Sequence, residues 1–124
     1  MGWRVLFALA ALYNLAVGGA MLAAPGALAP QLSVEGAGAP FALMMSGLLI
    51  AMFGVGYAMT ARDPAGNRGI VWIGMIGKIG AAALGTIQYQ AGIVQFSTFA
   101  LGMGDLVFVA LFALFLWRGP RLTR

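Results

Sequence analysis

Two ionisable residues, Lys78 and Asp105, interrupt long apolar stretches of this chain. A charged side chain at the centre of a bilayer costs about 2.5 to 3.5 kcal/mol on insertion scales unless it finds a partner or water. In apolar surroundings an ammonium and a carboxylate can pair with each other, relay protons or hold a polar substrate. These two residue types therefore predict either a structural ion pair or a functional site.

The sequence contains no cysteine and no histidine. Thiolate nucleophiles, iron–sulfur and zinc–thiolate sites, and the commonest general base and haem ligand are therefore excluded. Met45, Met52 and Met59 recur every seven residues and could offer thioethers to copper(I), but apolar packing by a flexible side chain is the preferred interpretation. We expect no enzyme activity, no metal and no cofactor, since no nucleophile and base pair is visible.

The elements that must position Lys78 and Asp105 are membrane spans. Of the 124 residues, 62% are hydrophobic and only 8% are charged, which is outside the range typical of soluble domains. A spanning helix needs about 20 apolar residues, so four spans with short connections use nearly the whole chain. We predict an all-α, single-domain integral membrane protein, an up-down four-helix bundle with spans at about residues 3–24, 41–61, 69–90 and 98–117.

Basic residues divide the predicted connections into two classes. The segments at about 24–40 and 91–97 carry no lysine or arginine, whereas the other side carries Arg4, Arg62, Arg68, Arg118, Arg121 and Arg124. Positive residues are retained on the cytoplasmic side, so we expect both termini in the cytoplasm of a multi-pass cell membrane protein, in a bacterial inner membrane. The net charge of +4 does not predict a nucleic-acid partner. Nucleic-acid binding requires basic residues clustered on one solvated face, whereas these residues sit at the ends of helices.

Four polar residues, one on each predicted helix, lie at similar estimated depths near the midplane of the membrane. At about 1.5 Å of rise per residue, the distances from the basic end are about 13 Å for Lys78, 16 Å for Asn14, 19 Å for Asp105 and 21 Å for Ser46. We expect a Lys78–Asp105 ion pair with Asn14 and Ser46 as hydrogen-bond partners. The cluster is either a proton or substrate site or a polar lock that sets helix register, and the spacing leaves both open.

Small residues form stripes on two of the predicted helices. One stripe contains Gly74, Ala81 and Gly85 beside Lys78, and the other contains Gly47, Ala51, Gly54 and Ala58. Such stripes let helix backbones approach closely, so we expect them to pack against other helices, with a cavity wall as the alternative.

Polar residues also lie at the end opposite the arginines. Gln88, Gln90 and Glu35 could line an outer mouth that leads to the polar centre, and Gln88 continues the Lys78 stripe toward that surface. Simple solvation at the membrane interface is the preferred interpretation of these side chains.

Three of the predicted spans carry a short polar motif. The first span has Tyr13-Asn14, followed by Gly18-Gly19 and by Pro25-Gly26 where the span ends; the third has Gly77-Lys78 and the fourth has Gly104-Asp105. In this layout the chain resembles the small four-helix bacterial membrane proteins grouped as DoxX-like, over nearly its whole hydropathy profile. The resemblance implies a partner role beside membrane oxidoreductases in sulfur or redox metabolism. Length and span count are also similar to small multidrug resistance transporters, but Asn14 stands where their first helix carries an acid.

Three functions follow from these observations. The preferred one is a non-catalytic accessory or assembly subunit, which binds a larger membrane protein or itself through small-residue helix faces. The second is a small carrier or proton-coupled transporter that uses Lys78 and Asp105. The third is a binder of a quinone or another lipid-like ligand between the helices, which requires a cavity larger than four packed helices normally leave. The sequence names no substrate, partner or oligomeric state.

Overall fold

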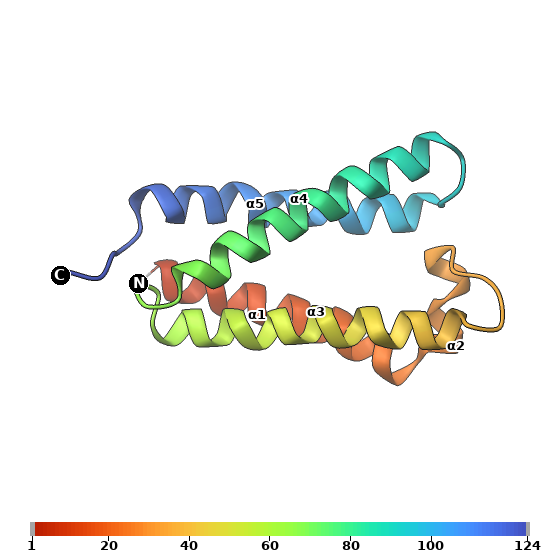
Figure 1. Cartoon of the computed structure of the whole chain (residues 1–124), viewed down its shortest axis with the longest axis horizontal. Helices are drawn as coiled ribbons and strands as arrows, with labels where there is room; N and C mark the ends of the chain where they lie inside the picture. Colours follow the sequence, from red (N-terminus) through yellow and green to blue (C-terminus); the bar gives the residue numbers. More distant parts are fainter. Residues whose placement is uncertain (1, 124) are drawn as a thin grey trace.

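Four long antiparallel helices make up the computed structural model, which describes residues 2–123 (Figure 1). They are α1 (Gly2–Ala23), α3 (Ala39–Arg62), α4 (Arg68–Gln90) and α5 (Phe96–Arg118). Each is long and apolar enough to cross a membrane. The predicted up-down four-helix membrane bundle is therefore confirmed. Arg124, counted above with the basic residues, lies outside the described part of the chain.

Proline and glycine set the limits of these helices. α3 begins two residues earlier than predicted, because Pro40 is tolerated in a first helical turn, where its missing N–H has no intrahelical partner. It ends at Arg62, because Asp63 precedes Pro64 and takes a non-helical conformation with φ −134° and ψ 84°. The predicted bounds of the four spans are otherwise within two residues of the observed ones.

The segment between α1 and α3 is more ordered than the predicted loop. It contains the short helix α2 (Pro25–Leu28) and the 3-10 helix η1 (Pro30–Leu32), which ends at Ser33 with a positive φ of 61°. Ala29 from this segment is buried in a small apolar cluster with residues of α1 and α3, namely Met21, Ala39 and Leu43. The segment thus covers one end of the bundle, opposite the two termini (Figure 1).

The four long helices pack as two close pairs. α1 makes its most extensive contacts with α3, and α4 makes its most extensive contacts with α5. Glycine is required where α1 meets α3, because a Cβ atom on Gly18 would lie 2.5 Å from the carbonyl oxygen of Gly47 and 2.7 Å from the backbone nitrogen of Ala51. The Gly47, Ala51 and Gly54 stripe therefore packs against another helix, as predicted, although Ala58 is exposed.

Aromatic rings join the two pairs at the end that carries the arginines, hereafter the arginine end. The ring centroids of Phe7 and Phe115 are 4.7 Å apart, and those of Tyr57 and Phe112 are 5.1 Å apart. All four residues are buried in one cluster. Because they come from α1, α3 and α5, this cluster closes the arginine end of the bundle.

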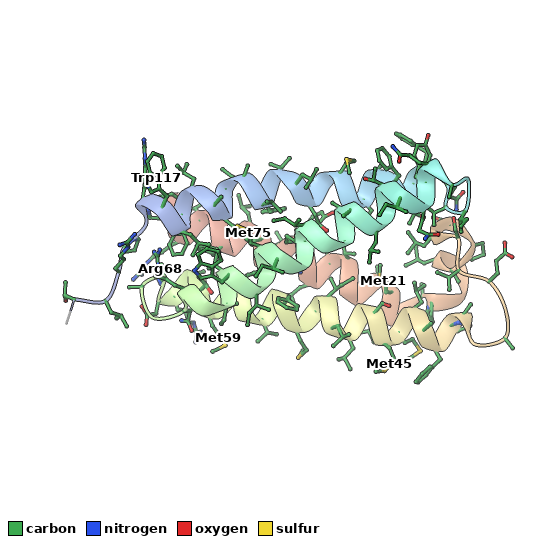
Figure 2. The ribbon with its side chains drawn as sticks, turned by 45° about the horizontal axis from the view of Figure 1, so that its top comes forward. Met21, Met45, Met59, Arg68, Met75 and Trp117 are labelled. Atoms are coloured by element: carbon green, nitrogen blue, oxygen red, sulfur yellow. The ribbon has the colours of Figure 1, made fainter. Side chains whose placement is uncertain are left out.

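Arg68, at the start of α4, binds backbone carbonyl groups at the end of α5. Its guanidinium donates hydrogen bonds to the carbonyl oxygens of Leu116 and Pro120, the latter at 3.0 Å, and lies 5.1 Å from the ring centroid of Phe115. The last carbonyls of a helix have no intrahelical partner, and a cation there also complements the helix dipole. Figure 2 shows Arg68 and Trp117 at this same end of the bundle.

Hydrogen bonds join the two pairs at the opposite end. The side-chain amide of Gln95 donates to the carbonyl oxygen of Pro30 at 2.7 Å and to that of Gln31, and the Ser97 hydroxyl donates to Gln31 at 2.6 Å. The backbone N–H of Gln95 donates to the Ser33 hydroxyl at 3.0 Å. These bonds tie η1 to the start of α5.

The close approach of α1 and α3 generates a first prediction. Replacing Gly18→Ala should destabilise the protein by about 1 to 3 kcal/mol, because the new methyl group meets backbone atoms that have no room to move. The matched control is Gly19→Ala on the same helix, whose Cβ would meet nothing within 4 Å and which should be neutral or stabilising by up to about 1 kcal/mol. Unfolding in detergent, followed by circular dichroism, measures both; equal effects would contradict the helix contact.

Candidate functional site

An ion pair lies in the middle of the bundle. The Lys78 ammonium nitrogen is 2.6 Å from one carboxylate oxygen of Asp105, and it donates a second hydrogen bond to the Asn14 side-chain oxygen at 3.2 Å. The side chains of Lys78 and Asp105 are 8% and 19% exposed. The Asn14 amide in turn donates to the carbonyl oxygen of Ile50 at 3.2 Å. One polar network therefore connects α1, α3, α4 and α5.

Ser46 does not belong to this network, and its predicted place there is wrong. Its side chain is exposed on α3 and its hydroxyl donates to the carbonyl oxygen of Ala42 at 2.9 Å, within the same helix. A serine in a helix can satisfy its hydroxyl in this way without a partner on another helix. The contribution of α3 comes instead from the backbone of Ile50.

Three aromatic rings surround the Lys78 ammonium group. Its nitrogen lies 5.4 Å from the ring centroid of Phe108, 5.7 Å from that of Tyr13 and 5.8 Å from that of Tyr57. A cation within about 6 Å of a ring face is attracted by the ring quadrupole. Sequence reasoning missed these residues, although Phe108 follows Asp105 by three positions, a spacing that places two side chains on one helix face.

A cavity of about 240 Å³ lies beside the ion pair. Its apolar lining comes mainly from Val17, Leu49, Ile50, Phe53 and Leu101. Its polar lining consists of Tyr13, Asn14, Tyr57, Lys78 and Asp105. The cavity thus combines apolar walls with a small group of convergent polar atoms, the combination typical of ligand sites in proteins.

The cavity opens sideways between α3 and α4. Its lining includes the exposed residues Leu49 on α3 and Gly77 and Ala81 on α4. α4 lies close to α3 near the arginine end and then diverges from it along its length (Figure 1). Because these exposed residues lie within membrane-spanning helices, the opening faces the hydrocarbon region of the bilayer.

The small-residue stripe of α4 was predicted to pack against another helix, and this prediction is wrong for much of its length. Instead of packing against another helix along its length, much of it borders open space: a Cβ atom on Gly85 would meet no atom within 4 Å, and Ala81 is exposed. Gly77 and Ala81 line the cavity, and Gly74 receives the hydroxyl of Tyr57. The stripe keeps the cavity open because α4 diverges from α3 at this level, so no neighbouring backbone fills the space.

The residues predicted to form an outer mouth do not line the cavity. Gln88 is half-buried near the end of α4, where its backbone carbonyl accepts a hydrogen bond from Ile93 at 2.9 Å. Gln90 is exposed, and Glu35 lies on a separate surface depression beside residues 92–95. The bonds between η1 and the start of α5 close this end, so the opening is lateral.

The three methionines singled out in the sequence lie on the outside of α3, away from the ion pair. Residues 2–123 contain no group of three or more acidic, cysteine or histidine residues that could hold a metal ion. Met45, Met52 and Met59 are exposed on the outward face of α3, where Figure 2 shows Met45 and Met59 pointing away from the bundle. The predicted apolar packing of these three side chains within the bundle is therefore wrong, because they lie on the outward face of α3.

A scan against protein-family models, a search of curated proteins and a search of solved structures all find no match. The structure itself places the protein among multi-pass membrane proteins with four helices. Its distinguishing feature is a buried ion pair beside a lateral cavity. The resemblance to DoxX-like proteins stays a prediction.

The ion pair generates a second prediction. Lys78→Met and Asp105→Asn should each destabilise the bundle by on the order of 3 kcal/mol, because each leaves one buried charge without its counter-charge. The double variant should recover most of this loss, because it removes both charges together. The three variants are compared by unfolding in detergent.

Ser46→Ala provides the control for this cycle. It removes a polar group at similar depth that contacts only its own helix, and it should change stability by less than about 0.5 kcal/mol. Additive effects of the two charge changes would show that Lys78 and Asp105 do not stabilise each other.

Proposed function

We propose that this protein binds a lipid-like molecule, which enters from the bilayer into the cavity between α3 and α4. The observation that carries the proposal is the form of this cavity, which has apolar walls and an opening toward the membrane. The polar residues Lys78, Asp105 and Tyr57 line one side of it, hereafter the polar floor. Molecules of this class combine an apolar chain with a polar head. The walls match the chain, and the Lys78–Asp105 network matches the head.

The closed ends of the bundle favour binding over transport. Alternating access requires that a central site connect in turn with each side of the membrane. Here the aromatic cluster of Phe7, Tyr57, Phe112 and Phe115 closes one end, and the hydrogen bonds of Gln95 and Ser97 close the other. The lateral opening leads to the lipid. A carrier or proton-coupled transporter that uses Lys78 and Asp105 is therefore the weaker proposal.

The ion pair supports a binding role in a second way. A lone charge on the cavity floor would be costly in hydrocarbon, and the pairing of Lys78 with Asp105 removes the net charge while keeping strongly polar atoms in place. Such a floor can anchor a polar group without requiring an ion from the ligand. The proposed role is therefore non-catalytic binding.

We further propose an orientation and a location. Among the described residues, the arginines lie near the termini and the turn between α3 and α4, at one end of the bundle (Figure 1). By the positive-inside rule this end faces the cytoplasm, with both termini. The DoxX-like layout supports a bacterial inner membrane.

A second candidate function is an accessory or assembly subunit of a membrane complex. The observation that favours it is the open glycine face of α4, where Gly77, Gly80 and Gly85 have no atom within 4 Å of an added Cβ. Such a face permits close approach of a helix from a larger protein or from a second copy. In this alternative a partner helix covers the cavity opening.

A third prediction tests the proposed binding. Gly77→Leu should place a bulky side chain in the cavity and remove bound lipid-like molecules without destabilising the fold, because a Cβ at this position meets no atom within 4 Å. Gly80→Leu is the matched control, since it is equally uncrowded on the same helix but does not line the cavity. Native mass spectrometry after reconstitution in a bacterial total lipid extract and mild delipidation measures the retained molecules.

The outcomes distinguish the two candidates. Retention of a molecule by the wild-type protein and the Gly80→Leu variant, with loss in the Gly77→Leu variant, is the expected result. Equal retention by all three, or by none of them, would refute the cavity as a binding site. Loss of a co-purified membrane protein in both leucine variants, with no lipid-like molecule retained by any of the three proteins, would instead support the accessory subunit.

A further inference from the structure

The hydroxyl of Tyr57 lies beside Gly74 at the edge of the cavity. Its side chain lines the cavity and the residue is only 1% exposed. Within residues 2–123 its hydroxyl takes part in no hydrogen bond, and it rests against Gly74 at a place where any side chain would collide with it. Among residues 2–123 the fully buried polar side-chain atom without a partner is Thr98 Oγ1, so the Tyr57 hydroxyl keeps some accessible surface. Its hydrogen-bonding capacity is therefore open to a molecule in the cavity that it borders.

Lys78 and Asp105 also keep unused hydrogen-bonding capacity beside the same cavity. A lysine ammonium has three donors, and the structure assigns two of them, to Asp105 and Asn14. A carboxylate accepts through both oxygens, and no described residue donates to the second oxygen of Asp105. The cavity therefore offers a donor on Lys78, an acceptor on Asp105 and both functions on Tyr57.

The charge of this floor limits which head group fits. Lys78 and Asp105 compensate each other, and they are the only charged residues in the cavity lining, so an ionic head group would leave an uncompensated charge inside the hydrocarbon region. A hydroxyl is neutral and both donates and accepts hydrogen bonds, which matches the unused donor and acceptors. An ester or a hydrocarbon chain end lacks the donor.

We infer that the cavity selects a neutral amphiphile whose head group bears a hydroxyl, held by Tyr57, Asp105 and Lys78 with its chain between α3 and α4. This inference rests on the proposed function, since it names the head group of the molecule that the cavity binds. The chemical class includes monoacylglycerols and long-chain alcohols.

A panel of oleyl-chain probes tests the head group. Monooleoylglycerol carries free hydroxyls, methyl oleate lacks a donor, oleyl sulfate is anionic and oleyltrimethylammonium is cationic. Each is added in turn to phosphatidylcholine nanodiscs that contain the full chain, and the bound fraction is measured by native mass spectrometry. We expect monooleoylglycerol to bind at least about tenfold more tightly than the other three, because it alone satisfies the floor without adding charge.

The Gly77→Leu variant separates the two possible failures. If no probe binds the wild-type protein better than this variant, the cavity is not a binding site, and the proposed function fails together with this inference. If a charged or donor-free probe binds as tightly as monooleoylglycerol and is lost in the Gly77→Leu variant, the cavity binds lipids but the assignment of the head group is overturned.

A fourth prediction concerns Tyr57 itself. Tyr57→Phe removes the hydroxyl and keeps the ring, so it should weaken monooleoylglycerol binding by about tenfold and weaken methyl oleate binding less, because the ester can only accept a hydrogen bond from this hydroxyl. Tyr89→Phe is the control, because Tyr89 stacks on Phe99 with centroids 4.5 Å apart and does not line the cavity. Equal weakening of both probes would show that Tyr57 only supports the fold.

Discussion

The structure depends on the requirement that a charge in hydrocarbon must be paired. Lys78 meets Asp105 at 2.6 Å, which joins α4 to α5, and Asn14 connects the same ammonium group to α1 and, through the carbonyl of Ile50, to α3. Rotating any one of these helices would separate polar groups that have no alternative partner in lipid. The rotation of every long helix is thereby set from the centre of the bundle.

Around this centre, small residues act in two different ways. On α3, Gly47 admits the backbone of α1, so that the two helices form the closest pair in the protein. On α4, Gly77 and Ala81 face no neighbouring backbone and leave a cavity. The difference lies in the partner, because α1 runs along α3 whereas α4 diverges from it (Figure 1). The same residue type thus produces tight packing in one place and an open space in another.

The closed ends and the open side together define what the cavity can do. Aromatic packing near Phe7 and the hydrogen bonds of Gln95 hold the two helix pairs together at opposite ends, so the space between them opens sideways between α3 and α4. The paired charges give this space a polar floor without a net charge.

The sequence by itself determined the four spans, their up-down order, the arginine end and the pairing of Lys78 with Asp105, because these follow from local hydropathy and from the two opposite charges deep inside the spans, away from the helix ends. It also placed Asn14 correctly. Only the tertiary structure decided that Ser46 faces outward, that Tyr57 borders the ion pair and that Gly77 lines a cavity. Depth along a helix follows from the rise per residue. Rotation and the distance between helices depend on contacts between segments far apart in the chain, and a single sequence does not reveal these.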